Sequence, residues 1–138
     1  MLCVVAFGAV WAATKPILND MVRASTYQNI GHVLDDDNRL DEAFAYYEKS
    51  RALWPADPMV NILLGRIRLD QKRPAEALPY FEEAVRLAPE SAPSHAAYGA
   101  GLLANGQRDA AAMEFAHALR LDPQNGRALQ GLRQARQP

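Results

Sequence analysis

The sequence has few of the features on which whole classes of protein depend. It contains one cysteine, Cys3, among 138 residues, so neither an intramolecular disulfide nor a zinc site built from several cysteines can form. Charge of neither sign predominates, because 15 Lys and Arg stand against 16 Asp and Glu. The net charge of −1 produces no overall field that would attract a nucleic acid. We therefore expect no nucleic-acid partner.

Arrangements typical of catalysis or of cofactor binding are also lacking. His32, His95 and His117 have no spacing typical of metal ligands or of a nucleophile and its base. The acidic run at 35–37 lacks the glycine and glutamate that a calcium-binding loop needs at its sixth and twelfth positions. The string at 99–104 resembles a dinucleotide fingerprint, but we expect it inside a helix and not after a strand. We predict no enzymatic activity, no metal, no cofactor and no small-molecule substrate.

The composition is that of a folded protein. Hydrophobic residues make up 49% and charged residues 22% of the chain, which is typical of globular proteins and unlike disordered ones. A length of 138 residues is enough for about one compact domain.

Strongly apolar sequence is confined to one segment at the start. Residues 1–13 carry no charged side chain, and Lys15 is the first. A run of this length suits a signal peptide, a buried helix or an interfacial segment, whereas a transmembrane helix needs about 20 apolar residues. As a signal peptide it has an apolar core and a cleavage position after Ala12, but no basic residue precedes the core. As an anchor it extends to residue 18. We favour the anchor, a single-pass membrane helix over 1–18, followed by a folded domain over 19–138.

Five columns of residues recur at an offset of 34 through the rest of the chain. A period of about 20 to 50 residues is typical of arrays of stacked units. The offset defines repeats at 24–57, 58–91 and 92–125, and a tail at 126–138. The columns are Gly31, Gly65 and Gly99; Ala43, Ala77 and Ala111; Tyr47, Phe81 and Phe115; Leu53, Leu87 and Leu121; and Pro55, Pro89 and Pro123.

This pattern resembles the tetratricopeptide repeat, which has a small residue in its first helix, alanine and an aromatic in its second, and a proline near its end. The resemblance implies an all-α fold of three helix-turn-helix repeats, stacked as a short right-handed solenoid and closed by a C-terminal capping helix. One turn departs from the family pattern. Lys72 stands where the family usually has glycine, whereas Gly106 and Asn38 suit a left-handed turn.

The glycine column requires a physical reason, because glycine in a helix costs about 0.5 to 1 kcal/mol relative to alanine. We predict that the facing alanine column supplies it, since two small side chains let the backbones of paired helices approach closely. The aromatic and leucine columns then surround this contact at helical spacing. Prolines also indicate where helices begin. We expect helices to begin at or next to Pro58, Pro74 and Pro93.

The last repeat of an array needs a cap with a polar outer face. Residues 126–136 predict such a helix, with an apolar stripe of Ala128, Leu129, Leu132 and Ala135. The tail also carries three arginines. They could contact an anionic partner, but we favour ordinary complementation of the helix dipole. At the other end, we expect Pro16 to open a helix that leads into the first repeat.

The resemblance also implies a groove lined by the first helix of each repeat, which would bind an extended peptide or a helix of a partner protein. Binders of chaperone tails in this family hold a peptide carboxylate with lysine and asparagine, and this groove lacks that set, so we do not expect a chaperone-tail receptor. The groove positions are Ser25, Gln28, His32 and Asp35 in the first repeat, Met59, Ile62, Arg66, Leu69 and Asp70 in the second, and Ala96, Ala100 and Leu103 in the third.

An apolar terminus joined to a repeat body without catalytic groups favours one function. We predict a non-enzymatic scaffold for protein–protein interaction that serves as an accessory subunit or assembly factor of a larger membrane complex. The alternative is an exported or soluble adaptor that binds partner peptides transiently after a signal segment is removed.

Overall fold

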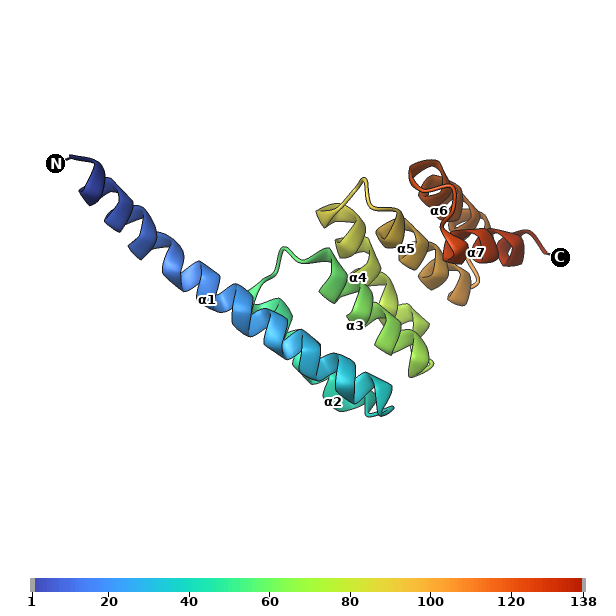
Figure 1. The fold of residues 1–138 in the computed structure, drawn as a ribbon. Helices are drawn as coiled ribbons and strands as arrows, with labels where there is room; N and C mark the ends of the chain where they lie inside the picture. The colour runs from blue at the N-terminus through green and yellow to red at the C-terminus, as the bar shows by residue number, and fades with distance from the viewer. Residues whose placement is uncertain (1, 138) are drawn as a thin grey trace. The chain divides into compact units, whose positions relative to one another are not determined.

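All regular structure in the described chain is α-helical, as predicted. The computed structural model describes the backbone of residues 2–137 and the side chains of residues 16–137. The helices are α1 (Leu2–Asp36), α2 (Leu40–Leu53), α3 (Pro58–Asp70), α4 (Pro74–Leu87), α5 (Ala92–Ala104), α6 (Arg108–Leu121) and α7 (Gly126–Arg136) (Figure 1).

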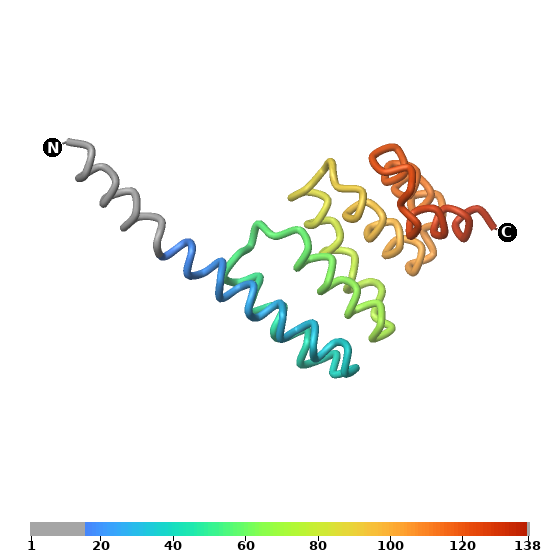
Figure 2. The backbone as a smooth tube through the Cα atoms, in the orientation of Figure 1, coloured from blue at the N-terminus to red at the C-terminus, as the bar shows by residue number. Residues whose placement is uncertain are grey.

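The helices form two compact units. Unit 1, Met1–Pro55, contains α1 and α2, and unit 2, Ala56–Pro138, contains α3 to α7. In unit 1 the second half of α1 packs along α2, as the backbone trace in Figure 2 shows. In unit 2 the pair α3 and α4 is followed by the pair α5 and α6, and α7 packs on both α5 and α6.

Helix α1 is continuous through Pro16, which lies inside it. The prediction that Pro16 opens a helix is therefore wrong; a proline inside a helix removes one backbone hydrogen bond without always ending the helix. The predicted membrane segment at 1–18 falls mainly on residues 1–15, which lie outside the part whose side chains are described. Within the described residues, no helix combines the length and the apolar character that crossing a bilayer requires.

The turn inside each repeat has the same left-handed geometry. Asn38, Lys72 and Gly106 have φ angles of 58°, 61° and 77°. The residue after each turn donates its backbone N–H to a carbonyl five residues earlier, as Arg73 does to Arg68 at 2.8 Å. This bond is typical of the Schellman motif that ends many helices. Lys72 thus occupies the glycine conformation despite its side chain.

Replacing Lys72 with glycine should stabilise the protein. A non-glycine residue in the left-handed region costs about 1 kcal/mol, so we expect Lys72→Gly to raise the free energy of unfolding by about that amount. Chemical denaturation of the full chain measures the effect. The matched control is Gly106→Ala, which should lower the free energy of unfolding by about 1 kcal/mol. Equal stability of Lys72→Gly and the parent would contradict this account of the turn.

Side-chain caps begin α3, α5 and α7. The carboxylate of Asp57 accepts a hydrogen bond from the Met59 N–H at 2.8 Å, and Ser91 Oγ accepts from Ser94 at 3.3 Å. Asn125 Oδ1 accepts from Ala128 at 3.0 Å. These caps also lie 34 residues apart, a sixth column that the sequence analysis missed.

The glycine column is explained by the aromatic column. A Cβ atom on Gly65 would lie 2.5 Å from Phe81 Cε1, and one on Gly99 would lie 2.8 Å from Phe115 Cε1. In unit 1 a Cβ on Gly31 would lie 2.5 Å from Tyr47 Cε1. The nearest atoms are ring carbons in every case, so the alanine column is not the reason for glycine. Glycine is required because an aromatic ring covers the helix backbone at that point.

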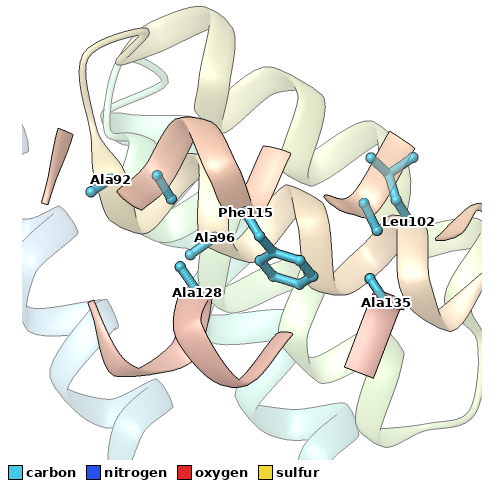
Figure 3. Packing of buried hydrophobic residues seen from close by; sticks show 8 residues of the cluster. Ala92, Ala96, Leu102, Phe115, Ala128 and Ala135 are labelled. Carbon is cyan, nitrogen blue, oxygen red and sulfur yellow. The ribbon is translucent and has the colours of Figure 1, made fainter. Parts of the chain in front are cut away.

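In unit 2 each ring is covered from a second side. A Cβ on Gly101 would lie 2.6 Å from Phe81 Cδ2, and one on Gly131 would overlap the ring of Phe115. Figure 3 shows the Phe115 ring among Ala96, Ala128 and Ala135, which belong to the same buried cluster. The ring of Phe81 therefore packs against both α3 and α5, and the ring of Phe115 packs against both α5 and α7. The alanine column is fully buried, with Ala43, Ala77 and Ala111 all 0% exposed.

Candidate functional site

Two hollows lie on the helices that begin the repeats of unit 2. The first hollow has a volume of about 350 Å³ and the second about 370 Å³. The first is lined by Met59, Ile62, Leu63 and Arg66 of α3, Pro93 and Ala96 of α5, and Asn125 and Arg127 at the start of α7. The second is lined by Ala100, Leu103 and Ala104 of α5, Phe115 of α6, and Arg127, Gln130, Gly131 and Gln134 of α7.

Arg127 is the residue that the two hollows share. It is exposed at the first turn of α7, and its guanidinium forms no ion pair or hydrogen bond with any residue that the structure describes. The other cation, Arg66, lies 3.8 Å from the carboxylate of Asp70, measured from Nη1 to Oδ2. The lining of both hollows contains no acidic residue. The surface is therefore apolar with a positive charge at the point where the two hollows meet.

The groove positions of the second and third repeats divide into two groups. Six of them line a hollow: Met59, Ile62 and Arg66, and Ala96, Ala100 and Leu103. The other two lie outside both hollows. Leu69 packs against the cluster around Phe81, and Asp70 is the ion-pair partner of Arg66.

The groove positions of the first repeat lie on α1 in unit 1. Ser25 and His32 are exposed, whereas Gln28 and Asp35 are half-buried. His32 Nδ1 lies 3.2 Å from the hydroxyl of the buried Tyr47, and the two rings meet edge to face. The His32 ring therefore also supports the packing of α1 on α2.

Helix α7 contributes to both hollows, whereas the sequence pattern predicts it only as a cap. The signal was present in the repeat. The offset of 34 continues from the third repeat into α7. It places Arg127 in the column of Pro93, Gln130 in that of Ala96 and Gln134 in that of Ala100. These three residues all line a hollow. Helix α7 is thus both the cap of the array and a further first helix that faces the hollows.

The predicted apolar stripe of α7 is correct in part. Ala128 and Ala135 are buried and Leu132 packs against the same cluster. Leu129 is 40% exposed, so its assignment to the stripe was wrong. Gly131 is buried in its place, because the ring of Phe115 covers that turn.

His95 is part of a buried polar contact and lines neither hollow. Its Nδ1 lies 2.7 Å from Glu114 Oε2 and its Nε2 lies 2.7 Å from the Pro89 carbonyl. The ring stacks on His117, with centroids 4.0 Å apart. These contacts join α5 to α6 and to the turn before α5, so His95 has a structural role.

Replacing His95 with alanine should destabilise unit 2. The change removes two hydrogen bonds from a side chain that is 4% exposed and leaves the Glu114 carboxylate without this partner. We expect the free energy of unfolding to fall by about 2 kcal/mol, as measured by chemical denaturation. His117→Ala is the control, because that ring contributes stacking without these bonds, and its effect should be under about 1 kcal/mol. Equal losses in both variants would exclude the hydrogen-bond explanation.

The hydroxyl of Tyr98 on α5 has a pKa above its usual range. Burial raises the pKa of Tyr98, and so does the hydrogen bond that its hydroxyl donates to Glu82 Oε1 at 3.1 Å. The phenol therefore remains neutral well above neutral pH, and it links α5 to α4 as a donor.

Comparison with known proteins agrees with this architecture. The family model of the tetratricopeptide repeat matches residues 29–92. The first such domain of Spaghetti (RPAP3), bound to the HSP90 peptide SRMEEVD, is 23% identical with a TM-score of 0.79, covering 83% of this chain and 91% of that one. The second domain of human RPAP3, in complex with the HSP70 peptide SGPTIEEVD, is 18% identical with a TM-score of 0.80, covering 86% and 99%.

The tetratricopeptide-repeat domain of Arabidopsis OM64 is 19% identical with a TM-score of 0.78, covering 85% of this chain and 97% of that one. Among curated proteins, none matches the chain significantly. The likeness at these identities concerns the fold. The chain has the tetratricopeptide-repeat fold, as the recurrence of five columns at an offset of 34 predicted.

Proposed function

We propose that this chain is a non-enzymatic scaffold that holds a segment of a partner protein against α3, α5 and α7, as an accessory subunit or assembly factor of a membrane complex. The observation that carries the proposal is the pair of adjoining hollows on these helices. Concave apolar surfaces with a few polar groups are typical binding sites. Repeat arrays present such surfaces to peptides and helices.

Partner binding is also supported by the solved neighbours. Domains of the same fold in RPAP3 bind peptides that end in the sequence EEVD. The present chain differs in the side chains available for such a tail, because Gln28 and His32 stand at the places where chaperone-tail binders of this family use lysine and asparagine. We therefore propose a different partner and not a chaperone tail.

The membrane part of the proposal depends on the N-terminal sequence. Residues 1–13 carry no charge, and the described part of α1 that follows exposes further apolar side chains. Ile17 is 51% exposed, Leu18 50% and Val22 66%. Such side chains on one helix favour contact with lipid or with an apolar partner.

The test is the size and composition of the native complex. Membranes from the source cells are extracted in a mild detergent, complexes are separated by size, and the proteins that migrate with this chain are identified. Comigration at fixed stoichiometry with a large membrane assembly is the expected result. Recovery of the chain in the soluble fraction, with a new N-terminus near residue 13, would instead support the exported adaptor. Full function of a chain that lacks residues 1–13 would also exclude the anchor.

A further inference from the structure

We propose that Arg127 selects the partner, and that the groove takes an internal protein segment in which an acidic side chain stands between two apolar side chains on one face. This inference rests on the proposed function, because it assumes that the hollows bind a protein. It adds the chemistry of the bound segment and the residue that recognises it.

The position of Arg127 indicates which ligand group it would bind. Its side chain lines both hollows, so a ligand group paired with its guanidinium would stand between them. The guanidinium has no charged partner among the residues that the structure describes, and neither hollow has an acidic residue in its lining. The planar donors of an arginine match the two oxygens of a carboxylate, and aspartate and glutamate supply that group within an unmodified protein segment. The complementary group is therefore the carboxylate of an aspartate or glutamate.

The hollows themselves determine what stands on either side of that carboxylate. Met59, which is 47% exposed, and Ile62 contribute apolar surface to the first hollow. Leu103 and Phe115 contribute it to the second. Volumes of about 350 and 370 Å³ lie at the lower end of the range for binding pockets. Each hollow therefore has room for a large apolar side chain of the ligand.

The arrangement favours an internal segment over the end of a chain. Because apolar hollows lie on both sides of Arg127, the ligand must continue in both directions from its acidic residue to fill them. A C-terminal carboxylate bound to Arg127 would leave one hollow empty. The same reasoning disfavours a polyanion such as RNA, which would leave both hollows without apolar contact.

The experiment uses the full chain in detergent micelles and a displayed library of random peptides, each flanked by linkers so that no peptide has a free C-terminus. Selected peptides are synthesised with blocked ends, and their affinities are measured by fluorescence anisotropy. The variants are Arg127→Gln and the control Arg133→Gln. Arg133 is exposed on the same helix but lines neither hollow.

We expect the selected peptides to share an aspartate or glutamate with apolar residues on both sides. Arg127→Gln should weaken their binding about tenfold, and Arg133→Gln should change it less than about twofold. Replacing the acidic residue of the peptide with its amide should cost about the same factor in the parent chain and little in Arg127→Gln, because the two groups form one pair.

Two results would overturn the inference in distinguishable ways. Selected peptides without an acidic residue, or peptides that Arg127→Gln binds as tightly as the parent, would refute the role of Arg127 while peptide binding itself remained. Failure of the parent chain to enrich any peptide would refute both this inference and the groove of the proposed function. Binding that appears only for peptides with a free C-terminus would refute the internal segment.

Discussion

Ala77→Glu should lower the free energy of unfolding by about 4 to 5 kcal/mol. Ala77 is 0% exposed and lies in the cluster with Ile62, Phe81 and Ala97. A glutamate there places four further heavy atoms in a packed interior, and it buries a carboxylate without a partner. A loss of this size is a large fraction of the total stability of a small protein.

The matched control is Ala75→Glu on the same helix. Ala75 is exposed in the first turn of α4, where an acidic side chain is favourable beside the helix N-terminus. Its effect should remain within about 0.5 kcal/mol. Thermal and chemical denaturation of both variants distinguish a burial effect from a general effect of added charge. An unchanged melting temperature for Ala77→Glu would refute the packing assigned to this column.

The repeat in the sequence was sufficient to predict the helices, because both the interior columns and the helix ends follow the same offset. Pro58 and Pro74 begin helices as expected, and α7 covers the predicted 126–136. Pro16 is the exception. Its sequence context resembles a helix start, yet the backbone remains helical through it, and only long-range structure could decide between these outcomes.

The cause of the glycine column could not be predicted from one sequence. Two small columns, glycine and alanine, suggested that they face each other, but the aromatic residue one helical turn after each alanine is the one that covers the glycine. The alanine and the aromatic residue share one helix face, so which of them contacts the partner helix depends on how far the two helices are shifted along their axes. Periodicity identifies a face, and it does not resolve a difference of one turn.

The candidate site was predictable to the extent that it repeats. Met59, Ala96 and Leu103 line hollows, and the family positions identify the same residues as a candidate groove. For Arg127, the interpretation of the tail as a cap predicts only complementation of the helix dipole, although Arg127 continues the column of Pro93 at the offset of 34. The hollows themselves depend on side-chain volumes between neighbouring helices, which a linear pattern does not contain.

Phe115→Ala should lower the free energy of unfolding by about 3 to 5 kcal/mol. The ring is 1% exposed and contacts α5 and α7 at Gly99 and Gly131, so its removal leaves a cavity where three helices meet. Chemical denaturation of the full chain measures the loss. Met113→Ala is the control, because Met113 is a large side chain on the same helix that is 73% exposed. It should change stability by less than about 0.5 kcal/mol, and equal losses in the two variants would contradict the buried position of the ring.

The same ring predicts a reversal of sign at Gly131. In the parent chain, Gly131→Ala should destabilise by about 1 to 3 kcal/mol, because the new methyl group overlaps the Phe115 ring. In the Phe115→Ala background the ring is gone, so the same change should stabilise by about 1 kcal/mol through the helix preference of alanine and partial filling of the cavity.

Gly126→Ala, whose Cβ would meet nothing within 4 Å, is the control and should have the same effect in both backgrounds. A double-mutant cycle measures the coupling. Additive effects at positions 115 and 131 would show that the ring does not require glycine there.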